Sequence, residues 1–123
     1  MKKWELLKEG KWLITGESGN SMLPILKSGQ KVILKPMPSL EELEIGDIVY
    51  SRVSGNFVTH EIKSLGSRGA LISNHAGHEN GWTKSIFGKV VGILTKRPSQ
   101  ELRDLVNEGD EEKIMNYIKD HEL

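Results

Sequence analysis

The sequence predicts a mainly β protein whose sheet is coiled or barrel-like. Short apolar runs of strand length recur over the first 95 residues, and turn-forming residues separate them. Many short strands joined by turns are typical of such a sheet. Apolar residues with helical spacing follow Pro98. We therefore expect a β domain over residues 1–97 and a helical C-terminal extension over residues 98–123.

The N-terminal elements are predicted to be a short helix and then strands. Residues 2–9 mix apolar and charged side chains, and Gly10 ends this helix. In the strand over residues 30–34, alternation places Val32 and Leu34 on one face and Ile33 on the other. The other predicted strands cover residues 11–15, 48–53, 57–63, 70–73 and 87–95.

Two loops are predicted between the later strands. Ser54-Gly55-Asn56 favours a tight hairpin turn, because these residues tolerate positive φ. Residues 74–84 are rich in polar side chains and glycine, and we expect a polar loop there.

The C-terminal extension is predicted to contain two short helices. Pro98 suits a first helical turn, Gly109 ends the first helix, and Asp110 caps the second. Ile114 and Ile118 then lie on one apolar stripe. This stripe either packs on the β domain or binds a partner, including a second copy of the chain.

Composition excludes several classes of function. Lys and Arg number 17, as do Asp and Glu, so the net charge is zero and argues against direct nucleic-acid binding through phosphates. The absence of cysteine excludes disulfides and thiol catalysis. No apolar run has the length of a signal peptide or a membrane span, and we expect a soluble, cytoplasmic protein.

Residues 18–24, Ser-Gly-Asn-Ser-Met-Leu-Pro, place two serines in a turn-forming segment. A serine held in a tight turn near backbone N–H groups can serve as a nucleophile beside an oxyanion hole. A purely structural turn explains the same composition.

This segment resembles the serine box of the signal-peptidase and repressor-autoprotease superfamily, whose pattern is Ser-Gly-x-Ser-Met-x-Pro. Further blocks resemble the family's later strands in the same order, including Ile-Gly-Asp-Ile-Val-Tyr, Phe-Val-Thr-His-Glu-Ile and Ile-Phe-Gly-Lys-Val-Val-Gly-Ile. These blocks are residues 26–34, 45–50, 57–62 and 86–93.

The resemblance implies a Ser/His endopeptidase, similar to the histidine-type signal peptidases and to small phage, prophage or bacterial relatives. Ser21 takes the position of the nucleophile and His60 that of the general base. The Ser18 hydroxyl and the Ser21 N–H would form the oxyanion hole. The substrate would be a peptide or protein, and no cofactor is expected.

The third member of the site departs from the family pattern. The family carries aspartates after the strand that follows the base, and here no aspartate lies between Asp47 and Asp104. Glu79, Asn80 or Asn74 could orient His60 instead. The departure keeps open an alternative, a catalytically degenerate member that acts as a protein-binding or regulatory module.

A metal site is a weaker interpretation of the same loop. His75, His78 and Glu79, with His60 nearby, offer ligands of the types that zinc accepts. Neither cysteines nor a helical His-Glu-x-x-His motif accompanies them, and we expect no metal.

Overall fold

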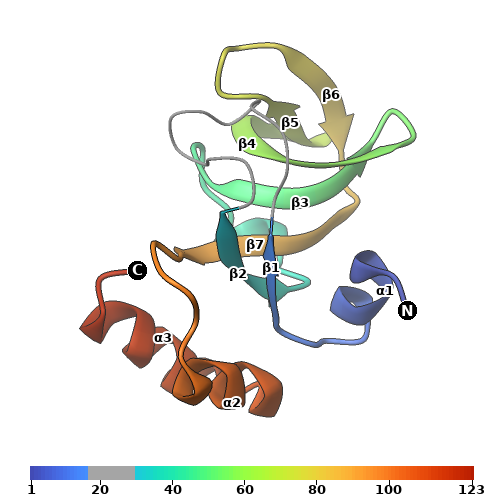
Figure 1. The fold of residues 1–123 in the computed structure, drawn as a ribbon. Coiled ribbons are helices and arrows are strands. Elements are labelled where there is room, and N and C mark those ends of the chain that lie inside the picture. Colours follow the sequence, from blue (N-terminus) through green and yellow to red (C-terminus); the bar gives the residue numbers. More distant parts are fainter. Residues whose placement is uncertain (17–29) are drawn as a thin grey trace.

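The structure, a computed structural model, describes residues 1–16 and 30–123 (Figure 1). The α-helices lie at the two ends of the described chain, and the strands lie between them. In chain order they are α1 (Lys3–Lys8), β1 (Leu13–Gly16), β2 (Lys31–Pro36), the 3-10 turn η1 (Leu40–Glu42), β3 (Ile48–Val53), β4 (Asn56–Gly66), β5 (Gly69–Ser73), β6 (Glu79–Thr83), β7 (Ile86–Ile93), α2 (Gln100–Glu108) and α3 (Glu111–Asp120).

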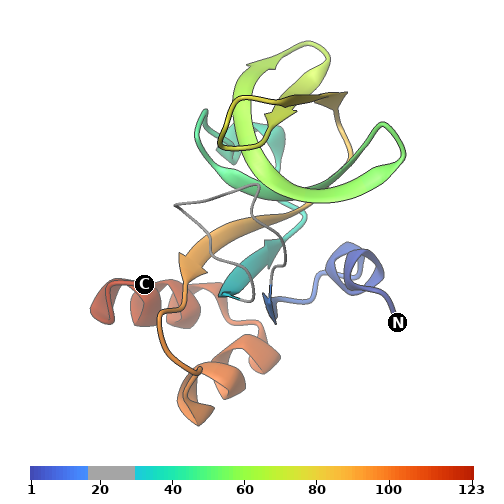
Figure 2. The same ribbon diagram turned by 45° about the horizontal axis from the view of Figure 1, so that its top comes forward.

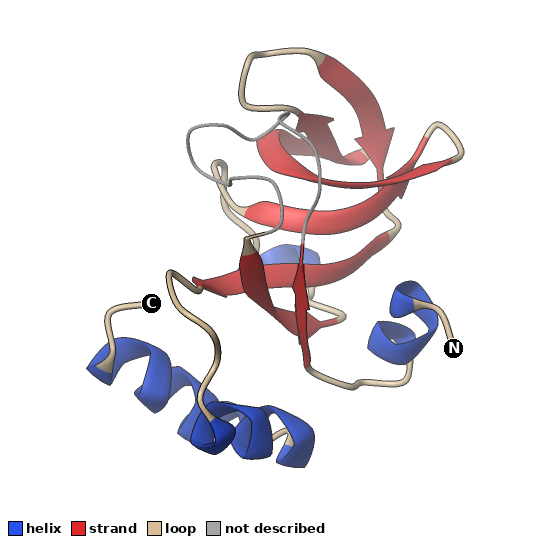
Figure 3. Cartoon of the chain, in the orientation of Figure 1, coloured by secondary structure: helices blue, strands red, loops and turns tan. Residues whose placement is uncertain are grey.

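The strands of the described residues form one antiparallel sheet in the order β1-β2-β7-β3-β4-β5-β6 (Figure 3). Strands β3 to β6 are neighbours both in sequence and in space. Strand β7 instead returns to lie between β2 and β3, so it joins the beginning of the chain to its middle. The sheet is open, with β1 and β6 at its edges, and the prediction of a mainly β protein is confirmed.

The half of the sheet formed by β3, β4, β5 and β6 is strongly curled (Figure 2). The curl brings β6 back to the end of β3. Ser54 Oγ donates a hydrogen bond of 3.2 Å to the Asn80 carbonyl oxygen, and Thr83 Oγ1 donates one of 2.6 Å to the Arg52 carbonyl oxygen. This half therefore encloses an apolar core of its own, while the sheet as a whole stays open.

The other half, β1, β2 and β7, is covered by helices on both faces. Successive side chains of β2 point to opposite faces of the sheet, as the sequence predicts, so β2 contributes to the core on both faces. Val32 and Leu34 pack with Leu7 of α1 on one face. Ile33 lies on the opposite face, in the cluster that α2 and α3 close.

The C-terminal helices pack on the sheet through their apolar stripes. Ile114 is fully buried and Ile118 nearly so, in one cluster with Trp12 of the N-terminal segment and Ile33 of β2. Of the two alternatives for this stripe, packing on the β domain is the one that the structure shows. Ile114 and Ile118 are therefore not available to a partner.

The ends of these helices follow their sequence signals, with one correction. Gly109 has φ of 70° and ends α2, and the Asp110 side chain accepts a hydrogen bond from the Lys113 N–H at the start of α3. Pro98 does not lie in the first turn of α2. Ser99 is the N-cap, because its hydroxyl accepts the Leu102 N–H, and the helix begins one residue later.

The prediction of a loop over residues 74–84 is also wrong in part, because β6 forms within it. Glu79–Thr83 lacks the alternation of apolar residues that marks a strand. This segment forms a strand because it pairs with β5, where Ile72 lies opposite Gly81. Pairing with an existing strand overrides weak local propensity here. In the described part of the chain, the helices are all too short or too polar to cross a membrane.

Candidate functional site

His60 lies in the middle of β4, on the inner face of the curled half. It pairs with Val49 of β3, and residues opposite each other in an antiparallel pair share a face. Val58 and Ile62 share that face by alternation, and both contribute to the apolar core of the curl. The imidazole is half-buried, so it combines an apolar wall with access from outside.

The imidazole contacts Asn80, which the curl brings across from β6. His60 Nδ1 and Asn80 Oδ1 are 2.6 Å apart. The carbonyl oxygen of Asn80 in turn accepts the hydrogen bond from the Ser54 hydroxyl. An amide oxygen can only accept a hydrogen bond, so this contact favours the tautomer in which Nδ1 carries the proton. This is the tautomer that a general base acting through Nε2 requires.

The other candidates for orienting His60 make different contacts. The Glu79 carboxylate lies 2.7 Å from Lys63 Nζ, and both side chains are half-exposed. Asn74 Oδ1 accepts a hydrogen bond of 2.8 Å from the His78 N–H, which stabilises the loop between β5 and β6. The side chain that lies against Nδ1 of His60 is therefore a neutral amide and not a carboxylate.

Ser18 and Ser21, the predicted oxyanion-hole donor and nucleophile, lie outside the described residues. The described chain stops at Gly16 and resumes at Gln30, and Gly16 is paired with Lys31. This end of β1 and β2 points toward the curled half of the sheet (Figure 1).

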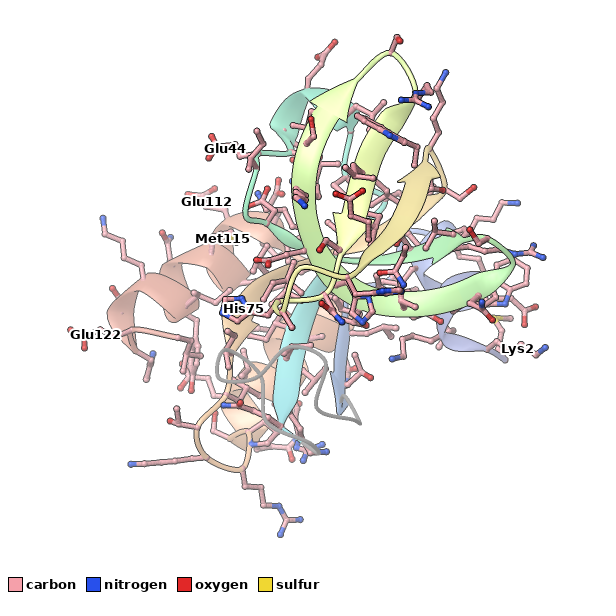
Figure 4. The ribbon with its side chains drawn as sticks, turned by 90° about the horizontal axis from the view of Figure 1, so that it is seen from above. Lys2, Glu44, His75, Glu112, Met115 and Glu122 are labelled. Atoms are coloured by element: carbon pink, nitrogen blue, oxygen red, sulfur yellow. The ribbon has the colours of Figure 1, made fainter. Side chains whose placement is uncertain are left out.

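The side chains considered above as metal ligands do not lie together at one site. His75, labelled in Figure 4, lies in the loop between β5 and β6. Its Nδ1 is 3.4 Å from Glu61 Oε1. Glu79 pairs with Lys63, and His60 contacts Asn80. Over residues 1–16 and 30–123, no three His, Asp or Glu side chains gather in a geometry that could hold an ion.

Sequence reasoning missed one buried polar residue on the face of the sheet that carries His60. Ser51 is fully buried on the inner face of β3, two residues from Val49, and its hydroxyl has no hydrogen-bond partner among the described residues. Alternation could have placed it there, since Val49, Ser51 and Val53 fall on one face. It did not stand out because serine is common in exposed positions.

Neither the protein-family models nor the curated proteins compared with this chain contain a match to it.

Proposed function

We propose that this chain is a serine endopeptidase of the signal-peptidase-like type, with the coiled β fold of that superfamily. The observation that carries the proposal is the 2.6 Å contact between His60 Nδ1 and Asn80 Oδ1. A general base that acts through Nε2 needs its Nδ1 proton held by such an acceptor. The contact also supports a role for His60 that was first inferred from its position relative to Ser21 in the sequence.

The reaction would be acyl transfer to serine. Ser21 Oγ attacks the peptide carbonyl while His60 Nε2 takes its proton, and the Ser18 hydroxyl and Ser21 N–H stabilise the oxyanion. His60 then gives the proton to the leaving amine, and water hydrolyses the acyl-enzyme by the reverse sequence. Asn80 would hold the imidazole in place without the negative charge that stabilises an imidazolium.

The test is the rate at which a fluorophosphonate probe labels the chain between pH 5 and 9. Ser21→Ala should abolish labelling, and His60→Ala should lower its rate by about 10²–10⁴-fold. Asn80→Ala should lower the rate by at least about tenfold, because the ring loses its orienting partner. Asn74→Ala is the matched control, since that amide contacts a backbone N–H and not the ring. Labelling that survives Ser21→Ala unchanged would refute the proposal.

Asn80→Asp gives a second, independent readout. A carboxylate beside the ring should raise the pKa of His60 by about one unit or more. The acid limb of the labelling profile should move to higher pH, and the plateau rate should rise. The pKa itself can be measured by NMR of the imidazole carbon. If it does not move, Asn80 is not the partner of the ring in solution.

A binding module without catalysis is the second candidate, and the neutral amide at position 80 is what favours it. An imidazolium formed beside Asn80 is less stabilised than one beside an acid. This candidate predicts that no variant of Ser21 or His60 alters the biological activity of the chain. It also needs a binding surface other than Ile114 and Ile118, because both are buried.

A further inference from the structure

Over residues 1–16 and 30–123, no strand pairs with the outer edge of β1. β1 is the first strand of the sheet order and pairs with β2 alone. The Lys31 carbonyl oxygen accepts a hydrogen bond from the Leu94 N–H, on the side of β2 away from β1. In antiparallel sheets the hydrogen-bonded and non-hydrogen-bonded pairs alternate. Thr15 therefore bonds to β2, and Ile14 turns its N–H and C=O toward the open edge.

A groove runs along this strand, between the chain segment 10–14 and helix α2. Its two adjoining sections have volumes of about 410 and about 250 Å³. Trp12 and Leu13 on one side, and Val106 and Asn107 on the other, line both sections. The helix runs antiparallel to the strand, so the Ile14 end of the groove lies beside Arg103 and the Gly10 end beside Glu108.

The two ends of the groove differ in charge, because Arg103 lines one end, whereas both Glu108 and Lys11 line the other. Arg103 is half-buried, and no ion pair or side-chain hydrogen bond joins its guanidinium to any described residue. The nearest acid along the helix, Asp104, accepts a hydrogen bond of 2.9 Å from Gln100. Glu108 lines the other end, where Lys11 approaches Glu9 at 3.9 Å. An arginine guanidinium binds a carboxylate in a bidentate pair, so Arg103 favours an acidic side chain at its end of the groove.

We propose that this groove binds an extended segment of another protein, which adds a strand to β1 and places an acidic side chain on Arg103. Main-chain bonds to Ile14 would supply affinity, and the groove between Trp12 and Val106 would receive alternate apolar side chains. The site lies at the β1 edge of the sheet, and His60 lies in the curled half. The proposal therefore does not depend on the peptidase function.

The first experiment uses the full chain to select from a displayed library of random seven-residue peptides. A synthetic copy of the most enriched peptide is then the probe. We expect enriched sequences to combine β-branched residues with an Asp or Glu. Arg103→Glu should weaken binding of the probe by at least tenfold. Lys84→Glu is the matched control, because it makes the same charge change after β6, at the opposite edge of the sheet, and it should leave binding unchanged.

The second experiment is amide hydrogen exchange with and without the probe. Binding should slow exchange at Ile14, whose N–H faces the edge. Thr15 should exchange slowly in both states, because its N–H already bonds to β2. Equal effects of the Arg103 and Lys84 variants, or no change at Ile14, would overturn the proposal. So would a dimer in sedimentation that Arg103→Glu dissociates, since the edge would then belong to a second copy of this chain.

Discussion

At the scale of single residues, the buried hydroxyl of Ser51 has a measurable energetic effect. It is fully buried and unpartnered among the described residues. A polar group that loses its bonds to water without replacing them destabilises the folded state by about 1–3 kcal/mol. Ser51→Ala should therefore leave the free energy of unfolding equal to that of the wild type or raise it by up to about 1 kcal/mol. Urea denaturation measures this change.

Ser73→Ala is the comparison for that variant. Ser73 is also buried, but its hydroxyl donates a hydrogen bond of 2.9 Å to the Asn74 carbonyl oxygen. This substitution should destabilise the chain by about 1 kcal/mol. A loss of stability in Ser51→Ala as large as in Ser73→Ala would show that the Ser51 hydroxyl does have a partner.

The sequence could predict the type of chemistry at the candidate site but not its contacts. His60 was identified from the block of residues around it. Asn80 and Glu79 were equal candidates for its partner, because they are adjacent in sequence and a one-residue change of register exchanges their faces. The register was set by the pairing of β5 with β6, and the polar sequence of β6 gave no sign of that pairing.

At the scale of elements, the hairpin between β4 and β5 depends on the absence of a side chain at Gly69. A Cβ there would lie 2.2 Å from the Thr83 carbonyl oxygen, and φ is +96°. Gly77 has nearly the same φ, +99°, but open space around it. Both Gly→Ala variants incur the strain of a left-handed backbone, and Gly69→Ala alone adds the clash. We expect Gly69→Ala to lose about 1–3 kcal/mol more than Gly77→Ala in thermal unfolding.

The C-terminal helices give a second test at this scale. Ile114 is fully buried, whereas its neighbour Met115 is 39% exposed. Figure 4 labels Met115 on α3. Ile114→Ala should destabilise the chain by about 2–5 kcal/mol, and Met115→Ala should change it by less than about 0.5 kcal/mol. Calorimetric unfolding of both variants measures these two changes in stability. If their stabilities are equal, the helices do not pack on the sheet in solution.

Elements whose apolar residues recur with a clear strand or helix period were predictable from the sequence. Elements that form because they pair with a neighbouring strand were not. The faces of β2 and the helix boundaries at Gly109 and Asp110 followed from local patterns. The C-terminal stripe was recognised, but amphipathicity alone does not say which surface covers it. Burial of Ile114 and Ile118 beside Ile33 answered that question.

At the scale of the whole molecule, Lys35 of β2 links η1, the next element in the chain, to α3, which is distant in sequence. Its Nζ lies 2.6 Å from Glu42 of η1 and 2.6 Å from Glu111 of α3. The hydrogen bonds to Glu111 and then Glu42 raise the pKa of Lys35, and the hydrogen bond from Lys35 lowers the pKa of Glu42. These side chains are partly exposed, so the network should contribute no more than about 1 kcal/mol.

The signs of these shifts define the pH range of that contribution. The lowered pKa of Glu42 gives stability that is complete above the ordinary glutamate pKa of about 4.3 and is lost as the pH falls through the lowered value. The raised pKa of Lys35 gives stability that is complete below about pH 10.4 and is lost as the pH rises through the raised value. Lys35→Met should therefore lower Tm most between about pH 5 and 10. Lys113→Met is the control, and a Tm difference that persists unchanged to pH 2 would contradict the assignment.

The position of β7 has a consequence for the order in which the chain acquires its structure. β3 to β6 connect through neighbours and can begin to pair as soon as they leave the ribosome. β2 can pair early with β1, but it joins the rest of the sheet only through β7, because Val32 pairs with Ile93, some sixty residues later in synthesis. The nascent chain thus carries two separate parts of the sheet, β1–β2 and β3–β6, until residues 86–93 have been made. Closure by β7 then joins the early and late halves in one step.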